Sequence, residues 1–198
     1  MKKTILLTLI ATAISLSFKA QVAENATDIS PLLIGENAPD VEVKDINGKA
    51  TSLKAILTEK PTIIMFYRGG WCPFCNAHLA ELQEAEKEIN ALGFQMVAIS
   101  PDSPEKLKES LGKHKLTYKL YSDADLKVAQ AFGIAFKAPD QYKPMLLEAS
   151  GNANEGILPV PSVFVFNTTG VIDFEYINPN VKARLSAAML LAVLKTLK

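Results

Sequence analysis

The chain has 198 residues, which is long enough for one compact domain with a full hydrophobic core. Its 21 basic and 21 acidic side chains give no net formal charge, so no nucleic-acid partner is expected. Two cysteines are too few for a small scaffold held together by disulfides.

The N-terminus has the pattern of a secretory signal peptide. Lys2 and Lys3 precede an apolar run over residues 5–16, and Ala20 offers a small residue for cleavage. The run is shorter than the roughly 20 apolar residues that a membrane-spanning helix needs, so no stable membrane span is expected. We therefore predict a signal peptide over residues 1–20 and an exported protein, periplasmic or secreted after cleavage.

A short leader separates this peptide from the packed domain. Residues 21–33 have no clear apolar periodicity and are predicted to be flexible. Residues 34–198 are predicted to form one domain. It opens with a β-hairpin, because apolar and polar residues alternate around Val43 and Asn47-Gly48 is a favoured hairpin turn.

Strands and helices then alternate along the chain. Short runs of branched and aromatic residues predict buried strands, and apolar residues three or four apart predict helices with one buried face. In chain order, the predicted elements are strand 62–67, a helix ending near Gly93, strand 94–100, a helix from Pro104 to Leu111 that Gly112 helps to end, strand 118–121 and helix 125–132. This alternation implies parallel crossovers and an α/β architecture.

A long insertion and a final hairpin complete the domain. Residues 137–160 carry no strong periodicity, and loops of this length are usually functional or disordered. Residues 162–166 and 171–176 predict two antiparallel strands joined by a turn. Residues 181–197 predict a closing helix with a buried face formed by Leu185, Met189 and Ala192.

The two cysteines, Cys72 and Cys75, lie where a buried strand passes through a glycine turn into a helix. The unpaired N–H groups and the positive dipole end of that helix favour the thiolate at Cys72. The pKa of a free cysteine is ~8.5 and falls in C-x-x-C motifs, so Cys72 is predicted to be a nucleophile and Cys75 its disulfide partner. The alternatives are a structural disulfide and half of a zinc site with His78, which would need further ligands. His78 itself is predicted to face solvent or to be capped by a hydrogen bond, and not to act as a base.

Several segments in a fixed order make the chain resemble a known family. Their order is that of the peroxiredoxins of the alkyl hydroperoxide reductase and thiol-specific antioxidant (AhpC/TSA) superfamily. The segments are Gly35-Glu36-Asn37-Ala38-Pro39-Asp40, Tyr67-Arg68-Gly69-Gly70-Trp71-Cys72-Pro73-Phe74-Cys75, Ile99-Ser100-Pro101-Asp102, Tyr121-Ser122-Asp123 and Pro159-Val160-Pro161-Ser162-Val163-Phe164. The resemblance implies a thioredoxin-like fold, with a central mixed β-sheet flanked by helices, an N-terminal β-hairpin and an insertion before the last β-hairpin.

The resemblance also implies a reaction and its partners. Cys72 would attack hydrogen peroxide or an organic hydroperoxide and become a sulfenic acid. Cys75 would then close a Cys72–Cys75 disulfide, and a thioredoxin-like dithiol reductant would reopen it. The family needs neither a cofactor nor a metal, so none is expected here.

The chain departs from the standard family pattern at two positions. Gly69 stands where a threonine or serine is expected, and Pro161 stands where an arginine is expected at the start of a late strand. Arg68 is the nearby cation predicted to hold the thiolate and polarise the peroxide, and Trp71 is predicted to form the lip of the substrate site.

Pro161 also resembles the cis-proline of thioredoxins, which receives an extended disulfide substrate beside the cysteines. This likeness favours an alternative function, an exported thiol-disulfide oxidoreductase that acts on protein dithiols or disulfides. A non-catalytic adaptor is a third class of function compatible with the fold.

Overall fold

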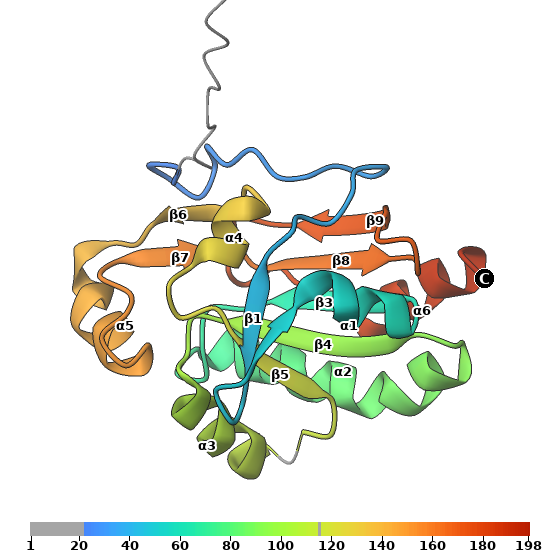
Figure 1. Cartoon of the computed structure of the whole chain (residues 1–198), viewed down its shortest axis with the longest axis horizontal. Coiled ribbons are helices and arrows are strands. Elements are labelled where there is room, and N and C mark those ends of the chain that lie inside the picture. The colour runs from blue at the N-terminus through green and yellow to red at the C-terminus, as the bar shows by residue number, and fades with distance from the viewer. Residues whose placement is uncertain (1–21, 115) are drawn as a thin grey trace, which may run out of the picture.

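A seven-stranded mixed sheet forms the middle layer of the computed structural model, which describes residues 22–114 and 116–198 (Figure 1). Its strand order is β2-β1-β5-β4-β3-β8-β9, with β3 parallel to β4, β4 parallel to β5, and the other neighbours antiparallel. The strands are β1 (Glu42–Asp45), β2 (Ala50–Ser52), β3 (Thr62–Phe66), β4 (Gln95–Ser100), β5 (Lys119–Ser122), β8 (Ser162–Phe166) and β9 (Ile172–Ile177).

Helices cover both faces of this sheet, as the predicted thioredoxin-like α/β fold requires (Figure 1). They are α1 (Leu53–Glu59), α2 (Pro73–Ala91), α3 (Pro104–His114), α4 (Lys127–Ala131), α5 (Lys143–Ala149) and α6 (Ala187–Thr196). Among the residues that the structure describes, none of the helices is both long and apolar enough to cross a membrane. The predicted signal peptide lies outside the described residues.

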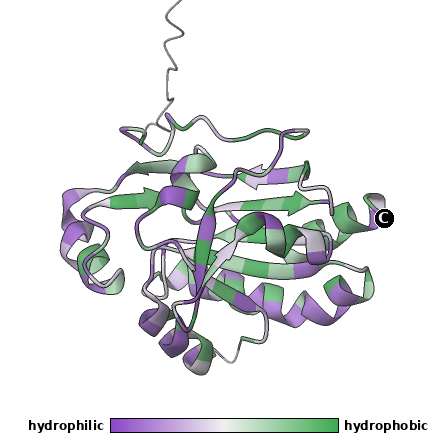
Figure 2. Ribbon diagram, viewed as in Figure 1, coloured by the Kyte–Doolittle hydropathy of each residue, from purple (hydrophilic) through white to green (hydrophobic). Residues whose placement is uncertain are grey.

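Two hydrophobic cores form because successive side chains of a strand point to opposite faces. In β3, Ile63 and Met65 belong to the core under α2, α3 and α6, whereas Ile64 and Phe66 belong to the core under α1 and α4. Figure 2 shows the apolar residues concentrated on the central strands and polar residues along the outer faces of α2 and α3.

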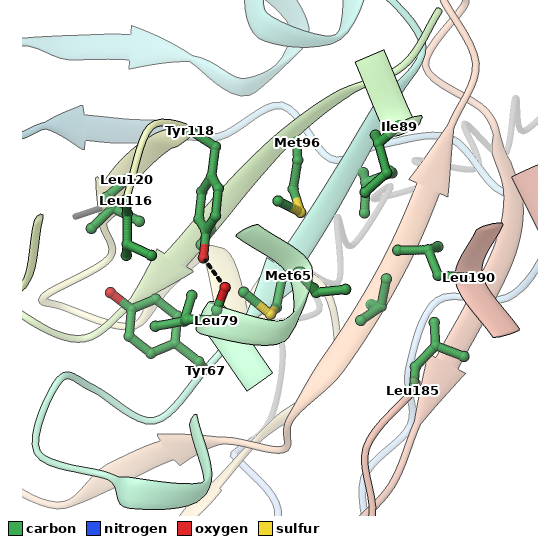
Figure 3. Close-up of a cluster of buried hydrophobic side chains, with 14 of the residues drawn as sticks. Met65, Tyr67, Leu79, Ile89, Met96, Leu116, Tyr118, Leu120, Leu185 and Leu190 are labelled. Atoms are coloured by element: carbon green, nitrogen blue, oxygen red, sulfur yellow. Dashed lines mark hydrogen bonds between the residues drawn. The ribbon is translucent and has the colours of Figure 1, made fainter. Parts of the chain in front are cut away.

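The core under α2 contains the residues that later position the site. Figure 3 shows Leu79 of α2 and Leu185, which precedes α6, converging on Met65 of β3. The hydroxyl of Tyr118 donates to the backbone carbonyl of Leu79 at 3.1 Å, which satisfies a buried polar group inside this core (Figure 3).

The N-terminal hairpin and the alternating elements are confirmed, with small shifts at their ends. β1 pairs with β2 around Asn47-Gly48, where Gly48 has a φ of +79°. The predicted end of α3 at Gly112 is wrong, because the helix continues to His114.

The predicted closing helix over 181–197 is also wrong in its first third. α6 begins only at Ala187, after Ser186 accepts a hydrogen bond from the Met189 N–H at 3.2 Å and caps the helix. The buried face is formed by Leu190 and Leu194, while Met189 is 54% exposed. Leu185 is buried, as predicted, but it lies in the extended segment before the helix.

The insertion over 137–160 is structured. Strands β6 (Ala135–Lys137) and β7 (Ile157–Pro159) pair antiparallel, and between them lie the 3-10 turn η1 (Asp140–Tyr142) and helix α5. The hydroxyl of Ser150 accepts from the N–H of Asn154 at 2.9 Å, and the Asn154 side-chain oxygen accepts from the N–H of Ile157 at 2.8 Å. These side-chain bonds order a polar stretch that has few apolar residues of its own.

Residues 22–33, predicted as a flexible leader, lie along the domain (Figure 1). Ala23 exchanges backbone hydrogen bonds with β6, donating to Ala135 at 3.0 Å and accepting from Lys137 at 2.9 Å. Ile29 and Leu32 pack against the core under α1 and α4.

Candidate active site

The site begins where β3 passes into α2. Cys72 is the N-cap residue of α2, and its backbone N–H donates to the Gly69 carbonyl at 3.1 Å, which closes a tight turn. Pro73 occupies the first helical position, where its missing N–H leaves no gap in the helix ladder. The strand, turn and helix expected around the cysteines are therefore confirmed, and they set Cys72 at the positive end of the helix dipole.

The two thiols form a single buried unit. Each cysteine is 1% exposed, both are free, and the Cys75 thiol donates to the Cys72 sulfur across 2.7 Å. This hydrogen bond, with further help from the Cys75 backbone N–H and the charges of Arg68 and Arg184, outweighs burial and lowers the pKa of Cys72 to about 6. The same hydrogen bond and burial raise the pKa of Cys75. Cys72 is therefore a thiolate at neutral pH, while Cys75 keeps the proton.

Arg68 packs on two aromatic rings beside the thiols. Its guanidinium carbon lies 4.8 Å from the ring centroids of both Trp71 and Tyr142, and the side chain is 9% exposed. The structure thus brings Arg68, Trp71 and the cysteines together, as predicted from their sequence spacing. Tyr142 comes from η1 in the insertion and was not predicted, because its position 70 residues along the chain from Cys72 carries no local signal.

Two buried N–H groups of this cluster have no acceptor among the described residues. They are Nε of Arg68 and Nε1 of Trp71. A buried donor without a partner costs free energy in the folded state. The two donors therefore need an acceptor that the described side chains do not supply.

Gly69 is required by the packing of this turn. Its φ is +136°, and a Cβ atom there would overlap Trp71 Nε1 and lie 2.7 Å from Asp102 Oδ1. The indole therefore occupies the space into which the side chain of a threonine or serine would project. The departure from the family pattern at this position is explained by the placement of Trp71.

Asp102 braces the turn from the neighbouring strand. Its Oδ2 accepts from the Gly70 N–H at 2.7 Å and from the Ser100 hydroxyl at 3.2 Å. Burial raises the pKa of this carboxyl to about 6, against the hydrogen bonds that favour its charged form. No role was predicted for Asp102 from the sequence. A signal existed, because parallel strands β3 and β4 end at the same edge of the sheet and Asp102 follows β4.

A cavity of about 240 Å³ opens beside the turn. Gly70 and Trp71 form one wall, α3 contributes Lys106 and Ser110, and α5 contributes Met145. Trp71 thus lies at the edge of a cavity whose lining includes neither cysteine, and its role as the lip of a substrate site stays a prediction. The insertion supplies the opposite wall.

Arg184 is a second cation at the site, and no sequence pattern predicted it. Its Nη2 donates to the Cys75 sulfur at 3.5 Å, across 109 residues of chain. Of the two placements predicted for His78, the solvent-facing one is wrong: it is 5% exposed, and its Nε2 lies 2.9 Å from the carbonyl oxygen of Leu185. The ring nitrogen must be the donor there, since a carbonyl only accepts, and burial lowers the pKa of His78.

Pro161 is buried between β7 and β8, and its carbonyl accepts from the Asn178 N–H at 3.3 Å. Phe66 pairs with Ser162, so Pro161 lies beside the chain that enters the active-site turn. The likeness to a cis-proline is not confirmed, because no cis peptide bond occurs in residues 22–114 or 116–198. The alternative function on protein disulfides, which is also favoured by the C-x-x-C spacing of Cys72 and Cys75, is not better supported than the peroxidase.

Comparisons with known proteins agree with this arrangement. The model of the AhpC/TSA family matches residues 34–175. The chain is similar to a putative peroxiredoxin Bcp of Haemophilus influenzae, with 33% identity over 106 residues that cover 54% of this chain and 68% of that protein. It is also similar to a putative peroxiredoxin of Mycobacterium tuberculosis, with 30% identity over 158 residues that cover 79% and 91% of the two chains.

The fold is similar to that of the solved peroxidoxin BcpB from Mycobacterium tuberculosis. The TM-score is 0.67 with 21% identity, covering 83% of this chain and 97% of that one.

The role of Gly69 is testable by adding one carbon atom. Gly69→Ala should displace the Trp71 ring, shift its fluorescence and lower the free energy of unfolding by more than about 2 kcal/mol, because overlap adds to the backbone cost. Gly48→Ala is the matched control, since Gly48 also has positive φ but has nothing within 4 Å of an added Cβ. Equal losses of stability in the two variants, with unchanged Trp71 fluorescence, would contradict this packing.

The hydrogen bond from the Cys75 thiol predicts that Cys72 ionises below neutral pH. The alkylation rate of the reduced protein, followed against pH, should rise with a midpoint of about 6 that belongs to Cys72. Cys75→Ala removes the main hydrogen-bond donor and should move this midpoint upward. A midpoint that stays near 6 in Cys75→Ala would show that the helix and the arginines are sufficient without the second thiol.

Proposed function

Because the chain belongs to the AhpC/TSA family, we propose that it works as a thiol-dependent peroxidase in which Cys72 is the nucleophile and Cys75 closes a disulfide. The observation that carries this assignment of roles is the Cys75 thiol donating to Cys72 across 2.7 Å. That contact leaves Cys72 ionised and keeps the protonated resolving thiol beside it.

In the first step, the Cys72 thiolate attacks one oxygen of hydrogen peroxide or an organic hydroperoxide. The O–O bond breaks, its electron pair leaves on the other oxygen, and protonation gives water or an alcohol. Cys72 becomes a sulfenic acid. In the second step, the Cys75 sulfur attacks the Cys72 sulfur, and the hydroxyl group leaves as water with the Cys75 proton.

Arg68 and Trp71 supply hydrogen bonds to the peroxide in this proposal. The unpartnered Nε–H of Arg68 and Nε1–H of Trp71 are donors for the peroxide oxygens, and the Arg68 charge stabilises the departing oxyanion. The indole N–H lies where a Cβ at Gly69 would project, so it replaces the hydroxyl that the family pattern has at that position. Pro161, beside the same turn, contributes to the wall of the substrate site.

A thioredoxin-like dithiol is the proposed reductant. Two electrons and two protons from such a partner return the disulfide to Cys72 and Cys75. The side chain of Phe74, between the two cysteines in the sequence, is 41% exposed and offers an apolar contact next to the buried sulfurs.

Export is a further part of the proposal, supported by the sequence of the N-terminus alone. Lys2 and Lys3, the apolar run and Ala20 match a signal peptide. Bacterial expression of the full chain should give a periplasmic product that is shorter by about 20 residues, as measured by mass spectrometry. Leu9→Arg interrupts the apolar run and should keep the full-length chain in the cytoplasm. Full-length cytoplasmic protein from both sequences would refute export.

The peroxidase mechanism predicts a fast first turnover. Stopped-flow mixing of the reduced protein with hydrogen peroxide should change the fluorescence of Trp71, the single tryptophan, at a rate proportional to peroxide concentration. Cys72→Ser should abolish the change, because the nucleophile is lost.

Cys75→Ser separates the two steps of the same reaction. It should still consume one equivalent of peroxide and then stop as a sulfenic acid, which a dimedone label detects. Peroxide consumption by Cys72→Ser equal to that of the parent chain would overturn the assignment of the nucleophile.

A further inference from the structure

The guanidinium group of Arg184 contacts the sulfur of Cys75, which is not the sulfur that attacks the peroxide in the proposed reaction. Arg184 belongs to the extended segment between β9 and α6, and its Nη2 donates to the Cys75 sulfur at 3.5 Å. Its Nε donates to the backbone carbonyl of Val181 at 2.9 Å, which fixes the plane of the guanidinium. The side chain is half-buried, so its charge is only partly screened by solvent.

The helix that carries Cys75 also holds the segment that carries Arg184. Three residues of α2, spaced by three, lie on one helix face: Cys75, His78 and Glu81. The His78 ring donates to the carbonyl of Leu185 at 2.9 Å, and Glu81 accepts from the Ala187 N–H at 2.7 Å.

Leu185, the residue after Arg184, anchors the segment between β9 and α6 in the core. It is 1% exposed and packs in the core under α2 (Figure 3). The chain directly after Arg184 is therefore fixed by the burial of Leu185 and by the hydrogen bonds of Leu185 and Ala187 to α2, and this places Arg184 beside Cys75.

The two sulfurs face different chemical demands when the disulfide is reduced. A thiolate of the reductant attacks one sulfur, and the other must accept the electron pair of the breaking S–S bond. Cys75 is a sulfur for which this is difficult, because it is 1% exposed and belongs to the apolar core under α2, where a new charge is poorly solvated. The positive charge of Arg184 acts in the opposite direction.

We propose that Arg184 is a catalytic residue of the reductive half-reaction, in which it stabilises the Cys75 sulfur as a leaving thiolate. The reductant thiolate bonds to the Cys72 sulfur, the Cys72–Cys75 bond breaks, and its electron pair moves to the Cys75 sulfur that Arg184 contacts. A second thiol of the reductant then releases Cys72, and solvent protons restore the thiols. Arg68 serves the peroxide step and Arg184 the recycling step, so each half-reaction has its own guanidinium.

The proposal rests on the Cys72–Cys75 disulfide of the proposed function, but its test needs no peroxide. The disulfide is formed beforehand with a small disulfide oxidant, and its reduction by dithiothreitol is followed through Trp71 fluorescence at about pH 8. This pH lies below the ordinary pKa of a thiol and of arginine. It lies well above the pKa of Cys72, which is about 6. Arg184→Met should slow reduction by about tenfold or more, the effect of losing one hydrogen bond to a charged group. Arg184→Lys keeps the charge and should recover most of the rate.

Lys182→Met is the matched control, because it removes one positive charge from the same segment at an exposed position. Its reduction rate should equal that of the parent chain. The first peroxide turnover of Arg184→Met, measured at the same pH, should change much less than the reduction rate, since Cys72 is already ionised there.

Equal reduction rates for Arg184→Met and Lys182→Met would overturn the proposal. So would an equal slowing in Arg184→Met and Arg184→Lys accompanied by a loss of thermal stability, which would mark a structural role. If Arg184→Met is reduced slowly but the parent chain does not react with peroxide, the peroxidase function is refuted and the role of Arg184 in disulfide reduction is kept.

Discussion

The hydrogen bond from the Cys75 thiol to the Cys72 sulfur is the interaction on which the site depends. It works because both sulfurs are buried at the first turn of α2, where water does not compete for the proton. The sharing of one proton makes the two chemically similar thiols different, one a nucleophile with a pKa of about 6 and the other a protonated partner. The helix dipole and the charge of Arg68 add to this difference, whereas the charge of Arg184 lowers the pKa of both thiols.

The packing around the turn follows from the same requirement for a fixed Cys72. Gly69 lets the Trp71 indole lie over the turn, and Asp102 holds the Gly70 N–H from the end of β4. The insertion contributes Tyr142, which packs on Arg68 and keeps its charge close to the thiolate. In the proposed peroxidase, the indole of Trp71 and arginines at other positions take the places of the family's usual hydroxyl and late-strand arginine.

The local elements were largely predictable, because they depend on short-range rules. Asn47-Gly48 defined the hairpin, and the apolar run over 62–67 defined β3. Errors arose where a tertiary contact overrode the local pattern. The segment before Ala187 has helical periodicity but stays extended, because Leu185 is buried against α2 and Ser186 caps the helix. The insertion looked like a loop because its order comes from side-chain hydrogen bonds of Ser150 and Asn154.

The sequence by itself determined the chemistry of the motif. Cys72 and Cys75 stand at a strand-to-helix turn, and the adjacent Arg68 and Trp71 had to lie nearby because they are only a few residues away. Only the tertiary structure decided which distant groups complete the site. Asp102 and Arg184 lie 32 and 109 residues from their partners in the site. The parallel strands β3 and β4 indicate only the edge of the sheet at which Asp102 lies, and no spacing rule places Arg184. Sheet register and the packing of the last segment on α2 bring them there, and these depend on the whole chain folding at once.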